Sequence, residues 1–150
     1  MADFFHVGLC VSSVERSLKF YERVLGMEVI KDQELKSAEF DELTANPGSR
    51  IRFAYLRLGS FILQLVEYTS GGGGTLPVAH NRVGSPHLSF FVDDVDAAYE
   101  RVTALPEVRH HKIVDLNAQM RTFYVFDPDG VPVELMQLVG SLPGLTDKDR

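Results

Sequence analysis

Two histidines and two side chains that carry a ligating oxygen occupy matching positions in two related stretches of this sequence. HVGLCVSSVERSLKFYERV begins at His6, and HLSFFVDDVDAAYERVTAL begins at His87, 81 positions later. Further along each copy the apolar runs LQLV and VELM align, so that Gln64 falls on Glu134. Two imidazoles, one amide oxygen and one carboxylate can all bind a single divalent cation. The pattern predicts a metal centre with the ligands His6, Gln64, His87 and Glu134.

Each of these polar residues interrupts a run that otherwise has the pattern of a buried strand. A buried polar group without a partner is costly, so something must satisfy each of them. On strict alternation His6 shares a face with Gly8 and Cys10, and the aliphatic residues take the other face. We therefore expect one face of the sheet to line a cavity and the other to pack on helices. A single histidine of this kind is more often a core residue, so the prediction depends on all four positions recurring together.

Other polar side chains have simpler interpretations. Glu67 is a rival ligand on the strand of Gln64, but its register does not match that of Glu134, and we expect it to be solvated. His110 and His111 fall outside the repeat, and His80 lies in the linker. Arg52 and Arg121 are more simply placed at the surface, whereas Tyr124 fits a core position and a cavity position equally well. As functional residues, the two arginines would bind an anionic group of a substrate, and the tyrosine would point its hydroxyl into the cavity.

The elements around these residues follow one order in both copies. In the first, a strand at 4–11 leads into a helix that Ser12 or Ser13 caps and Gly26 ends. Strands follow at 27–33, 50–59 and 60–68, and the last, apolar on both faces, is expected at the centre of a sheet. The second copy repeats this with a strand at 86–92, a helix from Asp93 or Asp94 to Leu105, strands at 108–116, 121–127 and 131–138, and a turn at DPDG. The predicted fold class is α+β, with two βαβββ modules (4–68 and 87–138) in a single domain, 1–150.

The segments between these elements are polar or rich in glycine. Residues 69–86, with four consecutive glycines, are expected to be a flexible linker, and residues 32–50 a polar insertion of the kind that often contacts substrate. The last ten residues are expected to form a frayed polar tail.

The composition narrows the class of protein. Of the 150 residues 45% are hydrophobic and 24% charged, as in an ordinary globular domain. A net charge of −6 without a basic cluster argues against nucleic acid as a partner. The single cysteine excludes an internal disulfide, and neither a signal peptide nor a membrane-spanning run is recognisable. We expect a cytoplasmic protein that does not interact with membranes.

Several short stretches resemble the vicinal oxygen chelate superfamily, which includes glyoxalase I, methylmalonyl-CoA epimerase, bleomycin and fosfomycin resistance proteins and extradiol dioxygenases. The resemblance rests on HVGL, FYERVLGMEV, ILQL, PHLSFFVDD and FYVFDPDGVPVEL, and it covers about residues 4–138. It implies two βαβββ modules that form an incompletely closed barrel around a metal ion. The metal ligands of the family fall on His6, Gln64, His87 and Glu134. This set is most similar to that of methylmalonyl-CoA epimerase.

The resemblance also implies a chemistry. Four protein ligands leave two positions on an octahedral ion for a small-molecule substrate with vicinal oxygens. The chain is thus expected to be a divalent-metal-dependent isomerase or lyase, like glyoxalase or the epimerase, that works through a metal-stabilised enediolate or enolate. The ion would be Co, Ni, Mn, Zn or Fe. Epimerase-like relatives carry a non-ligand carboxylate just before the strand at 50–59, where this chain has NPGS. The base is then an insertion carboxylate, Glu39, Asp41 or above all Glu42, or else Glu134 itself.

Three other functions remain open. One is a fosfomycin-modifying enzyme, which would need a thiol or water as nucleophile. An Fe(II) extradiol-type dioxygenase needs two histidines, one carboxylate and three open positions, one of which Gln64 would occupy. A non-catalytic small-molecule or antibiotic-binding resistance protein would not need the ligand set. Relatives pair, and we expect a homodimer.

Overall fold

The computed structural model describes residues 1–140, so the expected polar tail lies outside the described residues. The chain divides into two compact units, of which the first spans Met1–Leu76 and the second begins at Pro77. Each unit has a sheet of its own, with two helices in the first unit and one in the described part of the second.

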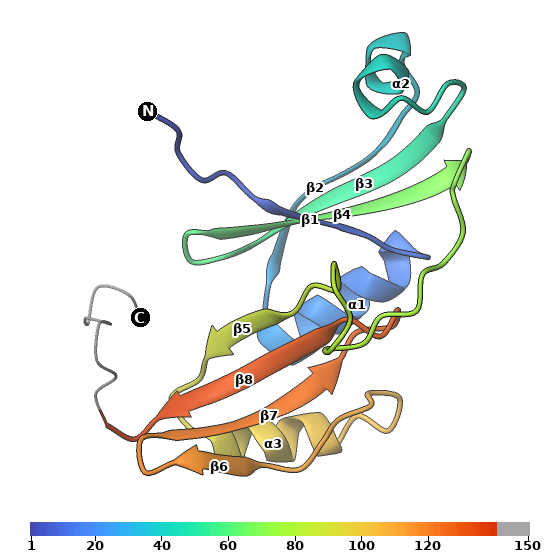
Figure 1. Ribbon diagram of the computed structural model, residues 1–150. Coiled ribbons are helices and arrows are strands. Elements are labelled where there is room, and N and C mark those ends of the chain that lie inside the picture. The colour runs from blue at the N-terminus through green and yellow to red at the C-terminus, as the bar shows by residue number, and fades with distance from the viewer. Residues whose placement is uncertain (141–150) are drawn as a thin grey trace. The chain divides into compact units, whose positions relative to one another are not determined.

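The first unit is a four-stranded mixed sheet with two helices (Figure 1). Its elements are β1 (Val7–Cys10), α1 (Val14–Leu25), β2 (Glu28–Leu35), α2 (Ala38–Thr44), β3 (Arg50–Leu58) and β4 (Phe61–Ser70). The strand order is β1-β4-β3-β2, in which β1 runs parallel to β4 and the other pairs are antiparallel. The apolar strand that we expected at the centre of a sheet, β4, is an inner strand.

The second unit repeats this arrangement. Its elements are β5 (Leu88–Phe91), α3 (Val95–Thr103), β6 (Val114–Asn117), β7 (Met120–Phe126) and β8 (Pro132–Leu138), in the strand order β5-β8-β7-β6. Again the first and last strands of the unit, β5 and β8, are parallel neighbours. The α+β class and the βαβββ order of each unit are therefore confirmed, with α2 as an addition in the first unit.

The strand predicted at 108–116 is wrong in its first part. Regular pairing with β7 begins only at Val114. Before it, His110 forms an isolated bridge with Val125, and the His111 N–H donates to the Tyr124 carbonyl. The apolar pattern identified a segment that lies beside β7, but not where the regular ladder starts.

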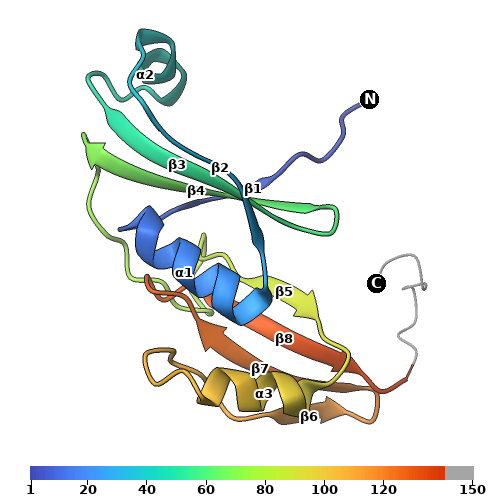
Figure 2. The same ribbon diagram turned by 180° about the vertical axis from the view of Figure 1, so that it is seen from behind.

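Helix α1 begins and ends as its sequence predicts. The Ser13 side chain accepts a hydrogen bond from the Arg16 N–H, and Gly26 adopts a left-handed conformation at φ 67°. The side chains that the helix buries are Val14, Ser17, Phe20, Tyr21 and Val24. The helix lies over β3 and β4 on one face of the sheet (Figures 1 and 2).

The aliphatic face of each sheet forms the core of its unit. In the first unit Leu9, Leu63 and Leu65 are buried, whereas Gly8 and Cys10 on the alternate face of β1 are exposed. In the second unit α3 lies along β7 and β8 (Figure 2), and Val133 and Leu135 are buried. Each sheet thus has one face covered by the helix of its own unit, and the histidines belong to the other face.

The polar insertion in the first unit contains a short helix that its composition did not predict. Ser37 caps α2 by accepting from the Phe40 N–H, and the Phe40 ring packs against Tyr68. Asp41 accepts hydrogen bonds from the Ser49 hydroxyl (2.8 Å) and from the backbone N–H groups of Gly48 (2.7 Å) and Ser49 (3.1 Å). These contacts fix α2 beside the start of β3, beyond the end of the sheet (Figure 1).

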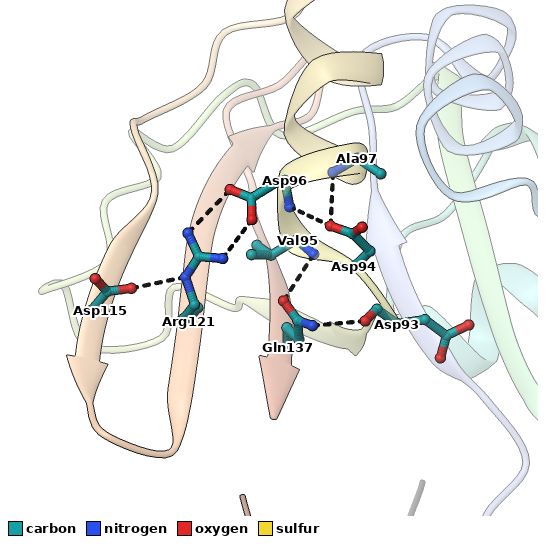
Figure 3. Close-up of polar contacts among 8 residues, drawn as sticks. All are labelled: Asp93, Asp94, Val95, Asp96, Ala97, Asp115, Arg121 and Gln137. Atoms are coloured by element: carbon teal, nitrogen blue, oxygen red, sulfur yellow. Dashed lines mark hydrogen bonds and ion pairs between the residues drawn. The ribbon is translucent and has the colours of Figure 1, made fainter. Parts of the chain in front are cut away.

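A side chain from the last strand of each unit holds the first N–H of the unit's first helix. Glu67 on β4 accepts from the Val14 N–H at 2.8 Å, and Gln137 on β8 accepts from the Val95 N–H at 3.2 Å (Figure 3). Glu67 follows Gln64 by three residues, and Gln137 follows Glu134 by three. Glu67, expected to be solvated, is therefore a repeated structural contact that satisfies a helix N-terminus.

This contact predicts a stability difference between two substitutions of Glu67. Glu67→Ala removes the acceptor from the helix N-terminus and should lower the free energy of unfolding by about 1 kcal/mol, as the loss of an N-cap does. Glu67→Gln should cost clearly less, because the second unit makes the same contact with glutamine. Urea unfolding of both variants measures the difference, and equal losses would contradict the assignment.

Asp41 predicts a dependence of stability on pH. The hydrogen bond from Ser49, followed by that from the Gly48 N–H, lowers the pKa of the Asp41 carboxyl. The stability that Asp41 contributes is then fully present above its unfolded pKa of about 3.9 and is lost as the pH falls through the lower folded value. Asp41→Asn should be less stable than wild type at pH 6, and the difference should shrink below about pH 4.

Unfolding free energies of wild type and Asp41→Asn between pH 6 and pH 3 test this. Ser49→Ala removes the hydrogen bond that lowers the pKa of Asp41 most. Its free energy of unfolding should therefore change less between pH 6 and pH 3 than that of wild type. A difference between wild type and Asp41→Asn that stays constant with pH would refute the assignment.

Candidate metal centre

The parallel pairing of first and last strands gives the predicted ligands the same relation in both units. Gly8 on β1 pairs with Gln64 on β4, and Ser89 on β5 pairs with Glu134 on β8. His6 and His87 each stand two residues before the paired residue and directly before the first residue of β1 or β5, so the strands predicted at 4–11 and 86–92 start too early. Each unit therefore brings one histidine and one oxygen ligand to the same end of two adjacent strands.

In the first unit, Tyr55 on β3 contacts both predicted ligands. It lies directly across from Gln64 in the antiparallel pair, and the Gln64 Nε2 donates to the Tyr55 hydroxyl at 3.0 Å. The rings of His6 and Tyr55 meet edge to face, with centroids 5.6 Å apart. The nitrogen Nδ1 of His6 is buried and has no hydrogen-bond partner among residues 1–140. A buried ring nitrogen of this kind is the type of group that a bound ion or water normally completes.

In the second unit, the carboxylate of Glu134 is buried, with 8% of the residue exposed. Its two oxygens accept hydrogen bonds from the Ser89 and Thr122 hydroxyls, each at 2.9 Å. Within the described part of the chain no ion pair reaches it. A buried carboxylate without a cationic partner is costly, and a bound metal ion would supply the missing positive charge.

His87 is exposed and belongs to an aromatic group with His80 and Tyr124. The His80 and His87 ring centroids lie 5.1 Å apart, and the Tyr124 hydroxyl lies 3.3 Å from the His80 Nε2. Burial, followed by the negative charge of Glu134, raises the pKa of the Tyr124 hydroxyl. His80, predicted to face solvent from the linker, is exposed but also touches the predicted ligand His87.

The donor set fits a divalent ion in its chemistry: two imidazoles, one amide oxygen and one carboxylate. In neither unit, within residues 1–140, do three or more His, Cys, Asp or Glu side chains gather closely enough to hold a metal by themselves. Each unit supplies half of the predicted set.

The insertion carboxylates are not brought to the His6–Gln64 pair within the first unit. Asp41 is committed to Ser49 and the adjacent backbone, whereas Glu39 and Glu42 are exposed on α2. The Asn46 side chain donates to the Gly71 carbonyl and ties the end of α2 to the end of β4. The start of β3, which pairs with this end of β4, lies five residues along the strand from Tyr55, or roughly 17 Å at the rise of a strand.

The two arginines considered for anion binding are engaged by carboxylates of their own units. Arg52 forms a two-point contact with Asp32, at 3.0 and 2.7 Å. Arg121 contacts Asp96 on α3 and Asp115 on β6 (Figure 3). The arginine hydrogen bond lowers the pKa of each of Asp32 and Asp96. These contacts join secondary-structure elements and leave neither guanidinium to a substrate.

Sequence reasoning missed Tyr55, Ser89 and Thr122. Tyr55 and Tyr124 occupy equivalent positions, because each is the cross-strand partner of an oxygen ligand. The tyrosine stands nine positions before its partner in the first unit and ten in the second, so the tyrosines do not align when the ligands do. Ser89 and Thr122 became recognisable only once strand pairing placed them beside Glu134.

Comparison with known proteins identifies a family to which this sequence is similar. Residues 3–135 match the sequence model described as the Glyoxalase/Bleomycin resistance protein/Dioxygenase superfamily. A lactoylglutathione lyase of Pseudomonas putida is 28% identical, over 89% of this chain and 84% of its own length. A 2-epi-5-epi-valiolone epimerase of an Actinomyces species is 30% identical, over 92% of this chain and 80% of its own.

The fold is also that of a solved member of the superfamily. The fosfomycin resistance protein FosX from Listeria monocytogenes, complexed with Mn(II) and sulfate ion, has a TM-score of 0.65 and 19% identity. The match covers 95% of each chain. No helix within residues 1–140 is long and apolar enough to cross a membrane. With its two βαβββ units and a family match over nearly its whole length, the chain belongs to the glyoxalase/bleomycin resistance/dioxygenase superfamily.

Proposed function

We propose that His6, Gln64, His87 and Glu134 bind one divalent metal ion and that the protein is a metal-dependent isomerase or lyase. The observation that carries this proposal is the buried carboxylate of Glu134, which accepts two hydroxyl hydrogen bonds and has no cationic partner in the described chain. In the other unit, the buried Nδ1 of His6, which has no hydrogen-bond partner among residues 1–140, supports it. The ion is Co, Ni, Mn, Zn or Fe.

The substrate is a small molecule with two adjacent oxygens and an acidic C–H next to a carbonyl. The bound ion supplies a Lewis acid that stabilises negative charge on those oxygens. The ligand residues set its strength: with neutral histidines, a neutral amide and one carboxylate, the centre keeps a net charge of +1. A second carboxylate in place of Gln64 would neutralise it, so the amide makes the stronger electrophile.

A carboxylate must accept the substrate proton, and two residues are proposed for this role. Glu134 is at the centre itself, and its Ser89 and Thr122 contacts orient it. Glu42 is the alternative: it is exposed on α2, which lies away from the His6–Gln64 pair of its unit, so it could act only if α2 moved toward the centre. Either would act as general base, which is worth about 10²–10⁴ in rate.

Two relatives indicate which reactions to test first. One is named for lactoylglutathione and lyase chemistry, and the other for the epimerisation of a valiolone. Both names fit a proton moved at carbon beside an oxygen function. We propose that the enzyme acts in the cytoplasm as a homodimer.

Metal content tests the proposal. Protein purified without chelator should carry about one divalent ion per chain by inductively coupled plasma mass spectrometry. His87→Ala should lose it, whereas His110→Ala, which removes a histidine outside the ligand set, should keep it. Metal-free wild type that cannot be reconstituted would overturn the proposed centre, and iron as the native ion would favour an oxygenase.

Activity then separates the two candidate bases. Metal-loaded protein should be assayed with methylglyoxal–thiol adducts and acyl-CoA epimers, and proton exchange at the substrate carbon should be followed by NMR. If Glu42 is the base, Glu42→Gln should lower kcat about 10²-fold or more while metal content stays at wild-type level. Unchanged turnover in Glu42→Gln would assign the role to Glu134.

A further inference from the structure

Gln64 differs from the other three predicted ligands in one respect. An amide has a single oxygen that can bind a cation, and its other end is an NH₂ group that only donates. A rotation of the amide group by half a turn would therefore place the NH₂ group, and not the oxygen, against the ion. A site that uses glutamine as a ligand needs a partner for the NH₂ end, so that the oxygen is left to face the ion.

The first unit contains such a partner. The Tyr55 hydroxyl accepts from the Gln64 Nε2 at 3.0 Å, directly across the β3–β4 pair. The Oε1 of Gln64 faces the opposite way, toward β1: a Cβ at Gly8 would lie 3.4 Å from it. Gly8 stands between His6 and Cys10 on the histidine face, so the oxygen lies on the side of His6.

The Tyr55 ring is held in place by its neighbours. It meets His6 at 5.6 Å, Phe53 at 5.6 Å and Phe5 at 5.9 Å between ring centroids. The hydroxyl therefore sits on a ring that is packed from several sides, including by the second predicted ligand of the unit. Because these contacts fix the position of the hydroxyl, the hydroxyl determines how the Gln64 amide is oriented.

The second unit shows the contrast. Tyr124 occupies the same cross-strand position opposite Glu134, but its hydroxyl lies next to His80. The Glu134 oxygens take their hydrogen bonds from two other hydroxyls, those of Ser89 and Thr122. The Glu134 carboxylate thus accepts hydrogen bonds from donors, and the NH₂ group of Gln64 donates to an acceptor, as the chemistry of each requires.

We propose that Tyr55 is a positioning residue for the metal centre: its hydroxyl accepts the Gln64 N–H, turns Oε1 toward the ion and strengthens that oxygen as a ligand. The inference rests on the proposed function, because it assumes that Gln64 binds the metal. An N–H that donates raises the electron density on the oxygen of the same amide, as outer hydrogen bonds raise the basicity of metal-bound histidines.

A double-mutant cycle with Gln64→Glu separates this role from a structural one. Co²⁺ is titrated into the metal-free full chain in competition with a chelator. Tyr55→Phe keeps the ring and should weaken Co²⁺ binding about tenfold or more. In the Gln64→Glu background the hydroxyl can only donate to a carboxylate and draw charge from it, so Tyr55→Phe should change binding by less than about threefold or tighten it.

Tyr68→Phe is the matched control, because Tyr68 lies on the strand of Gln64 and packs on Phe40. It should bind Co²⁺ like wild type. The same loss from Tyr55→Phe in both backgrounds would mean a structural role and overturn the inference, as would no loss in the wild-type background. Wild type that fails to bind Co²⁺ would refute the metal centre and, with it, the role of Tyr55.

Discussion

The parallel pairing of the first and last strands in each unit is the constraint on which the site depends. β1 lies beside β4, and β5 beside β8, although two strands and two helices separate the first pair in sequence, and two strands and one helix the second. Only this pairing brings a histidine from the start of a unit next to an oxygen ligand from its end. The helices α1 and α3 make it stable by burying the aliphatic face of each sheet, which leaves the face with the histidines for chemistry.

The two units share this strand pairing but differ in the charge of the predicted oxygen ligand. The first presents a neutral amide oriented by Tyr55, and the second a buried carboxylate held by Ser89 and Thr122. The cost of burying a carboxylate falls when a cation pairs with it. A neutral amide ligand, in contrast, cancels none of the charge of a bound ion. In the proposed centre, the carboxylate would help to bind the ion, and the neutral amide would leave the ion enough charge to withdraw electrons from a substrate.

Much of the fold could be predicted from the sequence, because the same pattern of residues occurs in both modules. Ser13 and Gly26 marked both ends of α1, and the apolar run of β4 marked an inner strand. Contacts that join distant elements could not be predicted from alternation alone. A comparison of Glu67 with Glu134 suggests a solvated side chain, whereas its counterpart in the repeat is Gln137, which makes the equivalent contact. The helix α2 was missed because capping and the Asp41 contacts stabilise it, not an apolar face.

The central claim is that one ion takes a histidine from each unit. X-ray absorption at the metal edge of Co²⁺-loaded wild-type protein tests this most directly, because imidazole rings give a distinct outer-shell scattering. We predict two imidazoles per ion, with oxygen in the remaining positions. A first shell of oxygen alone, or with a single imidazole, would contradict the claim.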